Sequence, residues 1–278
     1  MRKLKSVYAL ITGASSGIGE VFAEQLSKEG YPVILVARRK ERLQQTADKI
    51  EKQGGKAIVI TADLAKKEEC FGIIQQLEDK KIGVFINNAG FGDCGMFLSG
   101  DLEKETNMID VNIKAMHILC KLVLQKMKKQ EGGYLLNVAS SAGLIPAGPY
   151  MATYYATKAY VVSLTRAIAQ ELQDEGSNIY IGALCPGPVN TEFNSVANVE
   201  FALCGISPSY CVKYAIRQMK KRKVLIVPTL TIKAATFFGR FIPQSLYIKI
   251  AGHQQKKKFK GGQHRGRAAG FGVRSRSG

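Results

Sequence analysis

Two residues four positions apart, Tyr154 and Lys158, could together carry out proton transfer. On a helix, this spacing places both side chains on the same face, one turn apart. A phenol has an ordinary pKa of about 10, and a neighbouring ammonium favours its ionised form. The tyrosine could therefore exchange a proton nearer neutral pH. Tyr155 lies three positions before Lys158 and shares that face equally well, and an amphipathic helix with a chance Tyr/Lys pair is the alternative interpretation.

A glycine-rich turn near the N-terminus lies between an apolar run and a helical pattern. Residues 7–11 are suited to a buried parallel strand, and the turn occupies Thr12–Gly19. Gly13 would allow the tight turn, whereas Gly17 and Gly19 would let the backbone approach a pyrophosphate and the helix approach the sheet. The N-terminus of the helix would then face the phosphates with free N–H groups. A purely structural glycine turn is the alternative.

Apolar runs alternate with helical patterns along the chain and indicate the fold class. The predicted strands are 7–11, 32–37, 57–60, 84–86, 133–139, 179–184 and 224–227. The predicted helices are 20–28, 40–53, 66–79, 102–128, 154–175 and 208–220. This order predicts an α/β protein of the Rossmann type, with a right-handed, doubly wound parallel sheet of about seven strands and helices on both faces. Ligands bind to such sheets beyond the C-terminal ends of the strands.

Two strand ends carry candidates for nucleotide recognition. Arg38 follows the second strand, where an acidic residue usually binds the ribose of NAD and an arginine accommodates a 2′-phosphate. Arg38 therefore favours NADP(H), through a charge-assisted and fork-shaped contact; a solvated, basic start to the next helix is the alternative. Asp63 follows the third strand and could bind an adenine amino group, or it could cap the next helix.

Polar residues also occur in two places where the pattern is otherwise apolar. Asn112 lies within the apolar face of the helix predicted over 102–128. Asparagine is a poor residue for a helix interior, so a buried Asn112 would need a polar partner such as an ordered water. Ser140 and Ser141 come directly after the fifth strand, at the same edge of the sheet as the other candidates.

Taken together, these motifs resemble the short-chain dehydrogenase/reductase family over roughly residues 5–230. The resemblance rests on six motifs in the order of the family, namely Thr12–Gly19, Asn87–Gly90, Asn112, Ser140–Gly143, Tyr154–Lys158 and Pro186–Thr191. The Ala-Arg-Arg strand end at Ala37–Arg39 and the segment Tyr154–Tyr160 are similar to bacterial oxidoreductases near the 17β-hydroxysteroid and 3-ketoacyl reductases.

The resemblance implies a catalytic role for four residues. Tyr154 would be the general acid or base, and Lys158 would lower the pKa of Tyr154 and bind the nicotinamide ribose. Asn112 would hold a water that links Lys158 to solvent, and Ser140 would orient the substrate oxygen. The family's usual spacing of 13 to the tyrosine points to Ser141, but Ser140 fits the Ser-x-Ala-Gly register at the strand end, and a loop can absorb one extra residue. Tyr154 rather than Tyr155 preserves the motif.

The resemblance also implies a cofactor and a reaction. NADP(H) would be held by Gly13, Ser15, Ser16, Gly17, Ile18, Gly19, Arg38, Asp63, Leu64, Asn88, Ala89, Gly90, Tyr154, Lys158, Pro186, Gly187, Val189 and Thr191. The reaction would interconvert a carbonyl and an alcohol on an apolar molecule, because the loops 91–98, 144–151 and 190–206 are apolar and suit a hydrophobic ketone or aldehyde. A non-catalytic NADP(H)-binding sensor or scaffold on the same fold is the alternative function.

Composition bounds the remaining possibilities. A chain of 278 residues with 46% hydrophobic content can form a single large domain, here expected over 1–230 with a helical extension over 231–252. There is no apolar run of about 18 residues and no signal peptide, so we expect a cytoplasmic protein. The six cysteines form no CxxC pair and are expected to be reduced, and the three histidines show no ligand spacing, so we expect no metal site.

The C-terminal part of the chain is read separately. Residues 232–250 contain many aromatic and aliphatic side chains and are broken by Pro243, which predicts two short helices. This segment could cap the pocket, contact a partner subunit of a homo-oligomer, lie on a membrane surface, or pack on its own domain. Residues 253–278 are basic and rich in glycine, and we expect them to be disordered. Their charge could attract anionic lipid or nucleic acid, although we expect no nucleic-acid partner.

Overall fold

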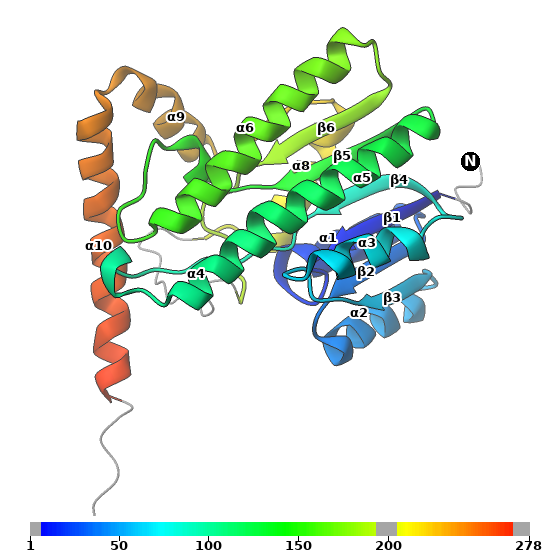
Figure 1. The fold of residues 1–278 in the computed structure, drawn as a ribbon, viewed down its shortest axis with the longest axis horizontal. Helices are drawn as coiled ribbons and strands as arrows, with labels where there is room; N and C mark the ends of the chain where they lie inside the picture. Colours follow the sequence, from blue (N-terminus) through cyan, green and yellow to red (C-terminus); the bar gives the residue numbers. More distant parts are fainter. Residues whose placement is uncertain (1–6, 193–204, 269–278) are drawn as a thin grey trace, which may run out of the picture.

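The computed structural model describes residues 7–192 and 205–268, with the backbone alone described for 257–268. A seven-stranded parallel sheet runs through the molecule in the order β3-β2-β1-β4-β5-β6-β7 (Figure 1). The strands are β1 (Val7–Thr12), β2 (Val33–Ala37), β3 (Ala57–Thr61), β4 (Lys81–Asn87), β5 (Gly133–Val138), β6 (Ile179–Leu184) and β7 (Leu225–Ile226). This confirms the predicted Rossmann-type sheet, in which the strand order reverses direction beside β1.

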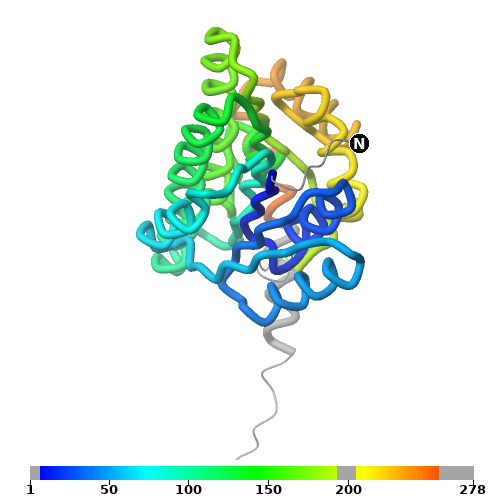
Figure 2. Tube along the Cα trace, turned by 90° about the vertical axis from the view of Figure 1, so that its right-hand side faces the viewer, coloured from blue at the N-terminus to red at the C-terminus, as the bar shows by residue number. Residues whose placement is uncertain are grey.

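Helices cover both faces of the sheet, because the central strands are apolar on both sides. One face packs against α1 (Gly17–Lys28), α2 (Lys40–Lys52) and α8 (Pro208–Lys220), and the other against α3 (Lys67–Gln76), α5 (Met116–Lys129) and α6 (Ala152–Asp174). Figure 2 shows the two layers on opposite sides of the sheet. The single helix predicted over 102–128 is in fact α4 (Leu102–Ile109), a π-helical stretch η2 (Asp110–Ala115) and α5 in succession.

The C-terminal segment forms a helical arm at one end of the molecule. It consists of α9 (Leu230–Phe238), the short helix η4 (Gly239–Phe241) and α10 (Gln244–Ala268), with Pro243 at the break (Figure 1). The extension was expected to end at residue 252, but α10 continues to Ala268 and Gln255 is buried within it. The structure places the first part of the segment predicted to be disordered in α10.

Two short 3-10 helices, η1 (Phe97–Ser99) and η3 (Ser141–Leu144), lie in the loops after β4 and β5. Within the described residues, no helix is both long enough and apolar enough to span a bilayer. In that same part of the chain, no three His, Cys, Asp or Glu side chains gather where they could hold a metal ion.

Candidate active site

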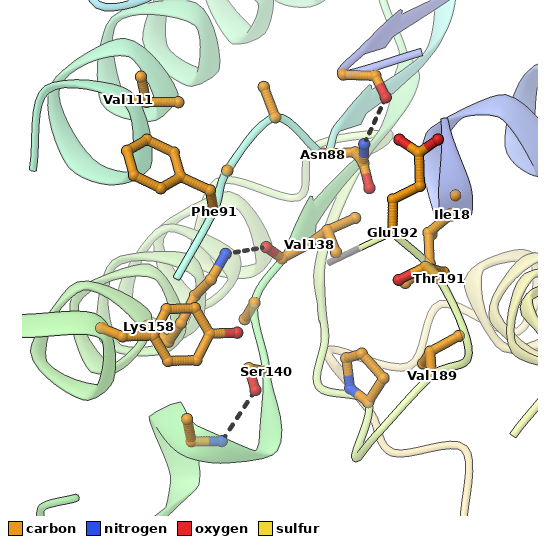
Figure 3. Close-up of a pocket in the computed structure, with 18 of the residues that line it drawn as sticks. Ile18, Asn88, Phe91, Val111, Val138, Ser140, Lys158, Val189, Thr191 and Glu192 are labelled. Carbon is orange, nitrogen blue, oxygen red and sulfur yellow. Dashed lines mark hydrogen bonds between the residues drawn. The ribbon is translucent and has the colours of Figure 1, made fainter. Parts of the chain in front are cut away.

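A cavity of about 490 Å³ opens beyond the C-terminal ends of the central strands. Every predicted site residue lines it except Gly19 and Asn112, so the fold gathers motifs that are distant in the sequence. Figure 3 shows Phe91 and Val111 on one side of the cavity, and Ile18, Thr191 and Glu192 on the opposite side. A glycine-lined end near α1 thus leads into a more apolar end near α6.

The glycine-lined end is shaped by backbones that approach each other closely. Gly13 and Gly17 have φ angles of +65° and +59°, in the left-handed region that favours glycine. Gly19 has no such φ, but a Cβ atom there would lie 2.2 Å from the carbonyl oxygen of Gly13. Gly19 therefore acts through helix–strand packing and sets the position of the α1 N-terminus, although it does not line the cavity itself.

A buried polar cluster fixes the strand ends that carry these glycines. The fully buried Thr12 hydroxyl accepts hydrogen bonds from the backbone N–H groups of Asn88 (2.9 Å) and Ala89 (3.1 Å). The Asn88 side chain donates in return to the Thr12 carbonyl at 2.9 Å. These bonds join the ends of β1 and β4 at the point where the strand order reverses. The cavity wall is therefore held by satisfied backbone groups on both strands.

Tyr154 and Lys158 lie on α6 and line the cavity, and both are buried. The Lys158 ammonium donates to the carbonyl oxygen of Val138 at 3.0 Å and lies 5.8 Å from the centre of the Tyr154 ring (Figure 3). The Ser140 side chain is hydrogen-bonded to Tyr154, and its Oγ accepts from Ala142 N at 3.1 Å. Ser140, Tyr154 and Lys158 therefore come together, whereas the backbone N–H of Ser141 donates to the carbonyl of Pro186 at 2.8 Å.

Burial dominates the protonation of this group. It raises the pKa of Tyr154 to about 12, against the lowering effect of the Ser140 hydrogen bond, and it lowers the pKa of Lys158 to about 8. The sequence led us to expect that the ammonium would bring the Tyr154 hydroxyl nearer neutral pH. In this structure, desolvation of the phenol is the largest influence on the pKa of Tyr154, and it acts in the opposite direction. At neutral pH the phenol holds its proton, and Lys158 is mostly charged.

Asn112 lies in the π-helical stretch and is 1% exposed. Its Oδ1 accepts from Phe91 N at 3.0 Å, and its Nδ2 donates to Phe91 O at 2.8 Å and Thr157 Oγ1 at 3.1 Å. The polar partner expected for this side chain is thus the protein itself. A Cβ on Gly90 would lie 2.9 Å from Asn112 Oδ1 and 3.3 Å from Lys158 Nζ. A side chain at position 90 would therefore crowd both Asn112 and Lys158.

At the outer wall of the glycine-lined end, an arginine that the site prediction did not include makes the principal contacts. Arg38 is exposed and lines the cavity, as expected. The neighbouring Arg39 also lines it, donates to Ser16 Oγ at 2.9 Å and Ser15 Oγ at 3.3 Å, and pairs with Glu192 at 3.1 Å. The Arg-Arg pair in the sequence was the available signal, but nothing in it could reveal Glu192, which lies 153 positions away.

Asp63 lines the cavity near the same wall. Its Oδ1 accepts from Ala65 N at 3.2 Å, and its own N–H donates to Glu69 Oε2 at 2.6 Å. The helix-cap alternative for Asp63 is wrong, because α3 begins at Lys67 with Lys66 at the cap position. Asp63 instead closes a local turn that holds the loop after β3 at the cavity wall.

The apolar end of the cavity is completed by the C-terminal arm. Ile232 of α9, together with Gln254 and Gln255 of α10, lines the cavity beside Met151. Gln255 donates to the Tyr155 hydroxyl at 2.5 Å, so the second tyrosine of the motif is bonded to the arm, whereas Tyr154 is bonded to Ser140. These contacts were not predicted from the sequence, although capping of the pocket was one of the alternatives for residues 232–250. Of the substrate loop predicted over 190–206, residues 193–204 lie outside the described part of the chain.

Comparison with known proteins gives a consistent result. A family model described as "short chain dehydrogenase" matches residues 7–200. A 17-beta-hydroxysteroid dehydrogenase type 3 from Danio rerio is 36% identical over 190 residues, which is 66% of this chain but only 61% of that protein. A ketoacyl reductase from Nostoc sp. is 34% identical over 227 residues, covering 80% of this chain and 78% of the relative. The chain thus matches less than two thirds of the length of the first of these relatives.

Two solved structures share the arrangement of the elements. A short-chain dehydrogenase from Sphingobium yanoikuyae, in complex with NADPH, superposes with a TM-score of 0.77 at 28% identity and covers 98% of each chain. A short-chain dehydrogenase/reductase from Burkholderia phymatum, in complex with NAD, gives the same TM-score at 23% identity over 85% of this chain and 94% of that one. The second likeness shows the fold alone.

Proposed function

The chain belongs to the short-chain dehydrogenase/reductase family, and from this premise we propose that it is an NADP(H)-dependent oxidoreductase that interconverts a carbonyl and an alcohol on an apolar small molecule. The observation that carries the proposal is the grouping of Ser140, Tyr154 and Lys158 in the wall of one cavity, which is also lined by glycines and by apolar side chains. Such a grouping has a clear use where a proton must be delivered to a substrate that lies between the two ends.

The residues of the glycine-lined end fit a dinucleotide. Gly13 and Gly17 keep the floor free of side chains, and a Cβ at Gly13 would lie 2.7 Å from Asn88 Nδ2, so the cradle is already packed from behind. The N-terminus of α1 borders the same space and suits the pyrophosphate. Val189 and Thr191 on the far side would hold the nicotinamide carboxamide. When bound, the nicotinamide would supply or accept the hydride.

The residues of the chain would handle the proton. In reduction, Tyr154 gives its hydroxyl proton to the carbonyl oxygen as that oxygen gains negative charge, and Ser140 holds the oxygen by a hydrogen bond. Burial keeps Tyr154 protonated at neutral pH, which suits a general acid. The nearby Lys158 ammonium stabilises the phenolate left behind and binds the ribose. Asn112 is a positioning residue, since its side chain is bonded to Phe91 and Thr157.

The proposal of NADP(H) over NAD(H) rests on the wall that carries Arg38 and Arg39. Both guanidinium groups line the cavity, and an arginine at this strand end suits a 2′-phosphate. Replacing Arg38 by Asp should lower the preference for NADPH over NADH by at least tenfold, measured as the ratio of dissociation constants. Unchanged selectivity in both the Arg38→Asp and the Arg39→Asp variants would remove these residues from cofactor choice.

The apolar end of the cavity and the steroid dehydrogenase named among the relatives both support a hydrophobic substrate. The test is a cofactor-coupled screen of ketones, aldehydes and acyl thioesters with NADPH and with NADH. The Tyr154→Phe variant should lose turnover by about 10²- to 10⁴-fold while it keeps its cofactor affinity. Tight cofactor binding without turnover of any compound would favour the alternative of a non-catalytic sensor.

A further inference from the structure

The C-terminal arm exposes an aromatic cluster that the proposed reaction does not use. Phe237, Phe238 and Phe241 are 53%, 63% and 75% exposed, and the ring centre of Phe237 lies 5.4 Å from that of Phe238 and 5.8 Å from that of Phe241. Leu230, at the other end of α9, is 81% exposed. We call these four residues the apolar cluster. Helix α9 is apolar yet has no buried residue, whereas an apolar helix of a globular domain is normally covered.

The part of the sequence that contains this cluster is strongly basic. Residues 201–278 contain 17 of the 40 Lys and Arg residues of the chain and none of its 22 Asp and Glu residues, so the excess charge of the protein lies almost entirely in this part. Arg240 sits within η4, between Phe238 and Phe241. Lys233 of α9 lies 5.8 Å from the ring centre of Tyr214, which also has the guanidinium of Arg217 at 5.6 Å. Lys233 and Arg217 thus lie beside a partly buried ring, and Arg240 lies between two exposed ones in the sequence.

The cations around the cluster are available for a partner. In the described part of the chain, Lys233, Arg240 and Lys249 pair with no carboxylate; Lys233 donates only to the Tyr214 hydroxyl, at 3.1 Å. The basic residues from Lys256 onward continue along α10 and beyond it in the sequence. A partner must therefore offer negative charge and, next to that charge, a phase that accepts aromatic side chains.

From these observations we propose that α9, η4 and the start of α10 form a docking surface for an anionic lipid bilayer. The apolar cluster would enter the boundary between headgroups and acyl chains, and the flanking cations would bind lipid phosphates. A second copy of the chain fits less well, because equal positive surfaces would face each other across the contact. Duplex nucleic acid offers phosphates but no apolar phase for the three rings and Leu230.

The docking surface and part of the cavity wall belong to the same C-terminal arm. Ile232 of α9 lines the cavity two residues after Leu230, and Gln254 and Gln255 line it from α10. Gly252 packs against Pro149, and Gln255 is bonded to Tyr155 on α6, so the arm is attached to the apolar end of the cavity. A lipid-dissolved substrate would reach the cavity over a short path. This consequence rests on the proposed function, whereas the docking itself does not.

Cosedimentation of the full chain with vesicles tests the docking. We compare vesicles of phosphatidylcholine with vesicles that also contain phosphatidylglycerol, at low and high salt. We expect binding to the anionic vesicles that weakens as salt rises. Replacing Phe237, Phe238 and Phe241 together by Ser should reduce the partition constant at least tenfold, and Arg240→Glu should reduce it severalfold. The matched controls are Phe71→Ser, whose ring is 45% exposed on α3, and Lys52→Glu on α2, and neither should change binding.

Equal vesicle binding by the triple Ser variant and the wild type would overturn the proposal. So would a wild-type dimer that the triple variant converts to monomers in analytical ultracentrifugation, since the cluster would then join two copies. Binding to duplex DNA without binding to either vesicle would overturn it as well. Turnover in detergent-free buffer, measured in parallel, separates this inference from the proposed function, because loss of docking leaves the reaction of a water-soluble carbonyl compound intact.

Discussion

The two ends of the cavity are built in different ways. At the glycine-lined end, the backbones of β1, α1 and β4 almost touch, and the Thr12 hydroxyl satisfies two buried N–H groups. At the apolar end, the wall includes a helical arm that is attached by side chains, such as the bond from Gln255 to Tyr155. The first end therefore tolerates almost no change in geometry, whereas the second can vary while the fold persists. A rigid end beside a variable end suits a protein family in which one cofactor chemistry serves many substrates.

Paired glycine substitutions offer the strongest test of the difference. In Gly19→Ala the new Cβ would lie 2.2 Å from a backbone oxygen, so α1 must move; in Gly252→Ala it would lie 3.1 Å from the Pro149 side chain. We expect Gly19→Ala to lower the free energy of unfolding by about 3 kcal/mol and to weaken cofactor binding on the order of 100-fold. Gly252→Ala should stay within about 1 kcal/mol of the wild type, because Ala favours a helix.

Urea unfolding and cofactor titration measure both effects. If the two variants unfold at the same urea concentration, the glycine-lined end is no more constrained than the arm, and the comparison fails.

Removal of one polar group at each end gives the next effect in size. Thr12→Val keeps the shape but leaves the N–H groups of Asn88 and Ala89 without their acceptor, and we expect a loss of about 2 kcal/mol in the free energy of unfolding. Gln255→Leu breaks the bond to Tyr155 but also removes Gln255 Oε1, a buried acceptor with no partner among the described residues. Its cost should be about 1 kcal/mol or less.

Thermal unfolding of these two variants beside Thr12→Ser, which keeps the hydroxyl, checks the prediction. A Gln255→Leu variant less stable than Thr12→Val would show that the arm, and not the strand junction, holds the cavity together.

The same division explains what the sequence could predict. Glycines, strand ends and the Tyr154–Lys158 spacing are local signals of backbone geometry, and they led to the correct sheet and to residues that line the glycine-lined end of the cavity. The pKa of Tyr154 was not predictable, because desolvation depends on everything packed around the ring. The Arg39–Glu192 pair was missed, since it joins segments far apart in the sequence, and the π-helical stretch at Asn112 was missed as well.

The C-terminal arm shows the limit of composition as a guide. The lysine- and glycine-rich sequence after residue 252 suggested disorder, yet α10 continues through it. Within this segment, Gln255 is buried and bonded to Tyr155 on α6, a contact that the sequence could not reveal. Composition describes what a segment can bury on its own, and it carries no information about a partner surface elsewhere in the chain.

The pH dependence of kcat/KM tests the role of Lys158, which lines the cavity. Burial lowers the pKa of Lys158 to about 8, so its charge is lost as the pH rises through that value. We expect kcat/KM for reduction to be constant below pH 8 and to fall about tenfold per pH unit above it. The Lys158→Arg variant, slower at every pH, should lack this inflection because arginine does not titrate there.

The stability of the protein should change with pH in the opposite sense. The folded pKa of Lys158 lies below its ordinary value of 10.5, so between about pH 8 and 10.5 the unfolded chain binds more protons than the folded one. This group therefore contributes a free energy of unfolding that increases with pH across that window.

For the rate profile, a kcat/KM that stays flat from pH 7 to 9 would show that the charge of Lys158 is not needed for reduction.

The smallest effect is expected at the ion pair of the outer wall, where the glycine-lined end meets solvent. The Arg39 and Glu192 side chains are 47% and 43% exposed, and the pair is therefore worth little in stability, about 0.5 kcal/mol or less. Arg39 and Arg42 hold the pKa of Glu192 below its ordinary value, so its carboxylate stays charged in the cavity that Arg38 also lines. A 2′-phosphate at this wall would meet that negative charge.

Glu192→Gln removes the repulsion between the Glu192 carboxylate and a 2′-phosphate, and it leaves Arg39 able to bind that phosphate. NADPH affinity should rise about threefold at low salt, the gain should shrink at high salt, and NADH affinity should not change. Glu41→Gln, at an exposed position in the first turn of α2, is the matched control and should alter neither affinity. Isothermal titration calorimetry with NADPH and with NADH measures the two affinities. An equal gain for NADH would mean that Glu192 acts on the part common to both cofactors, and Arg39 would then have no share in their discrimination.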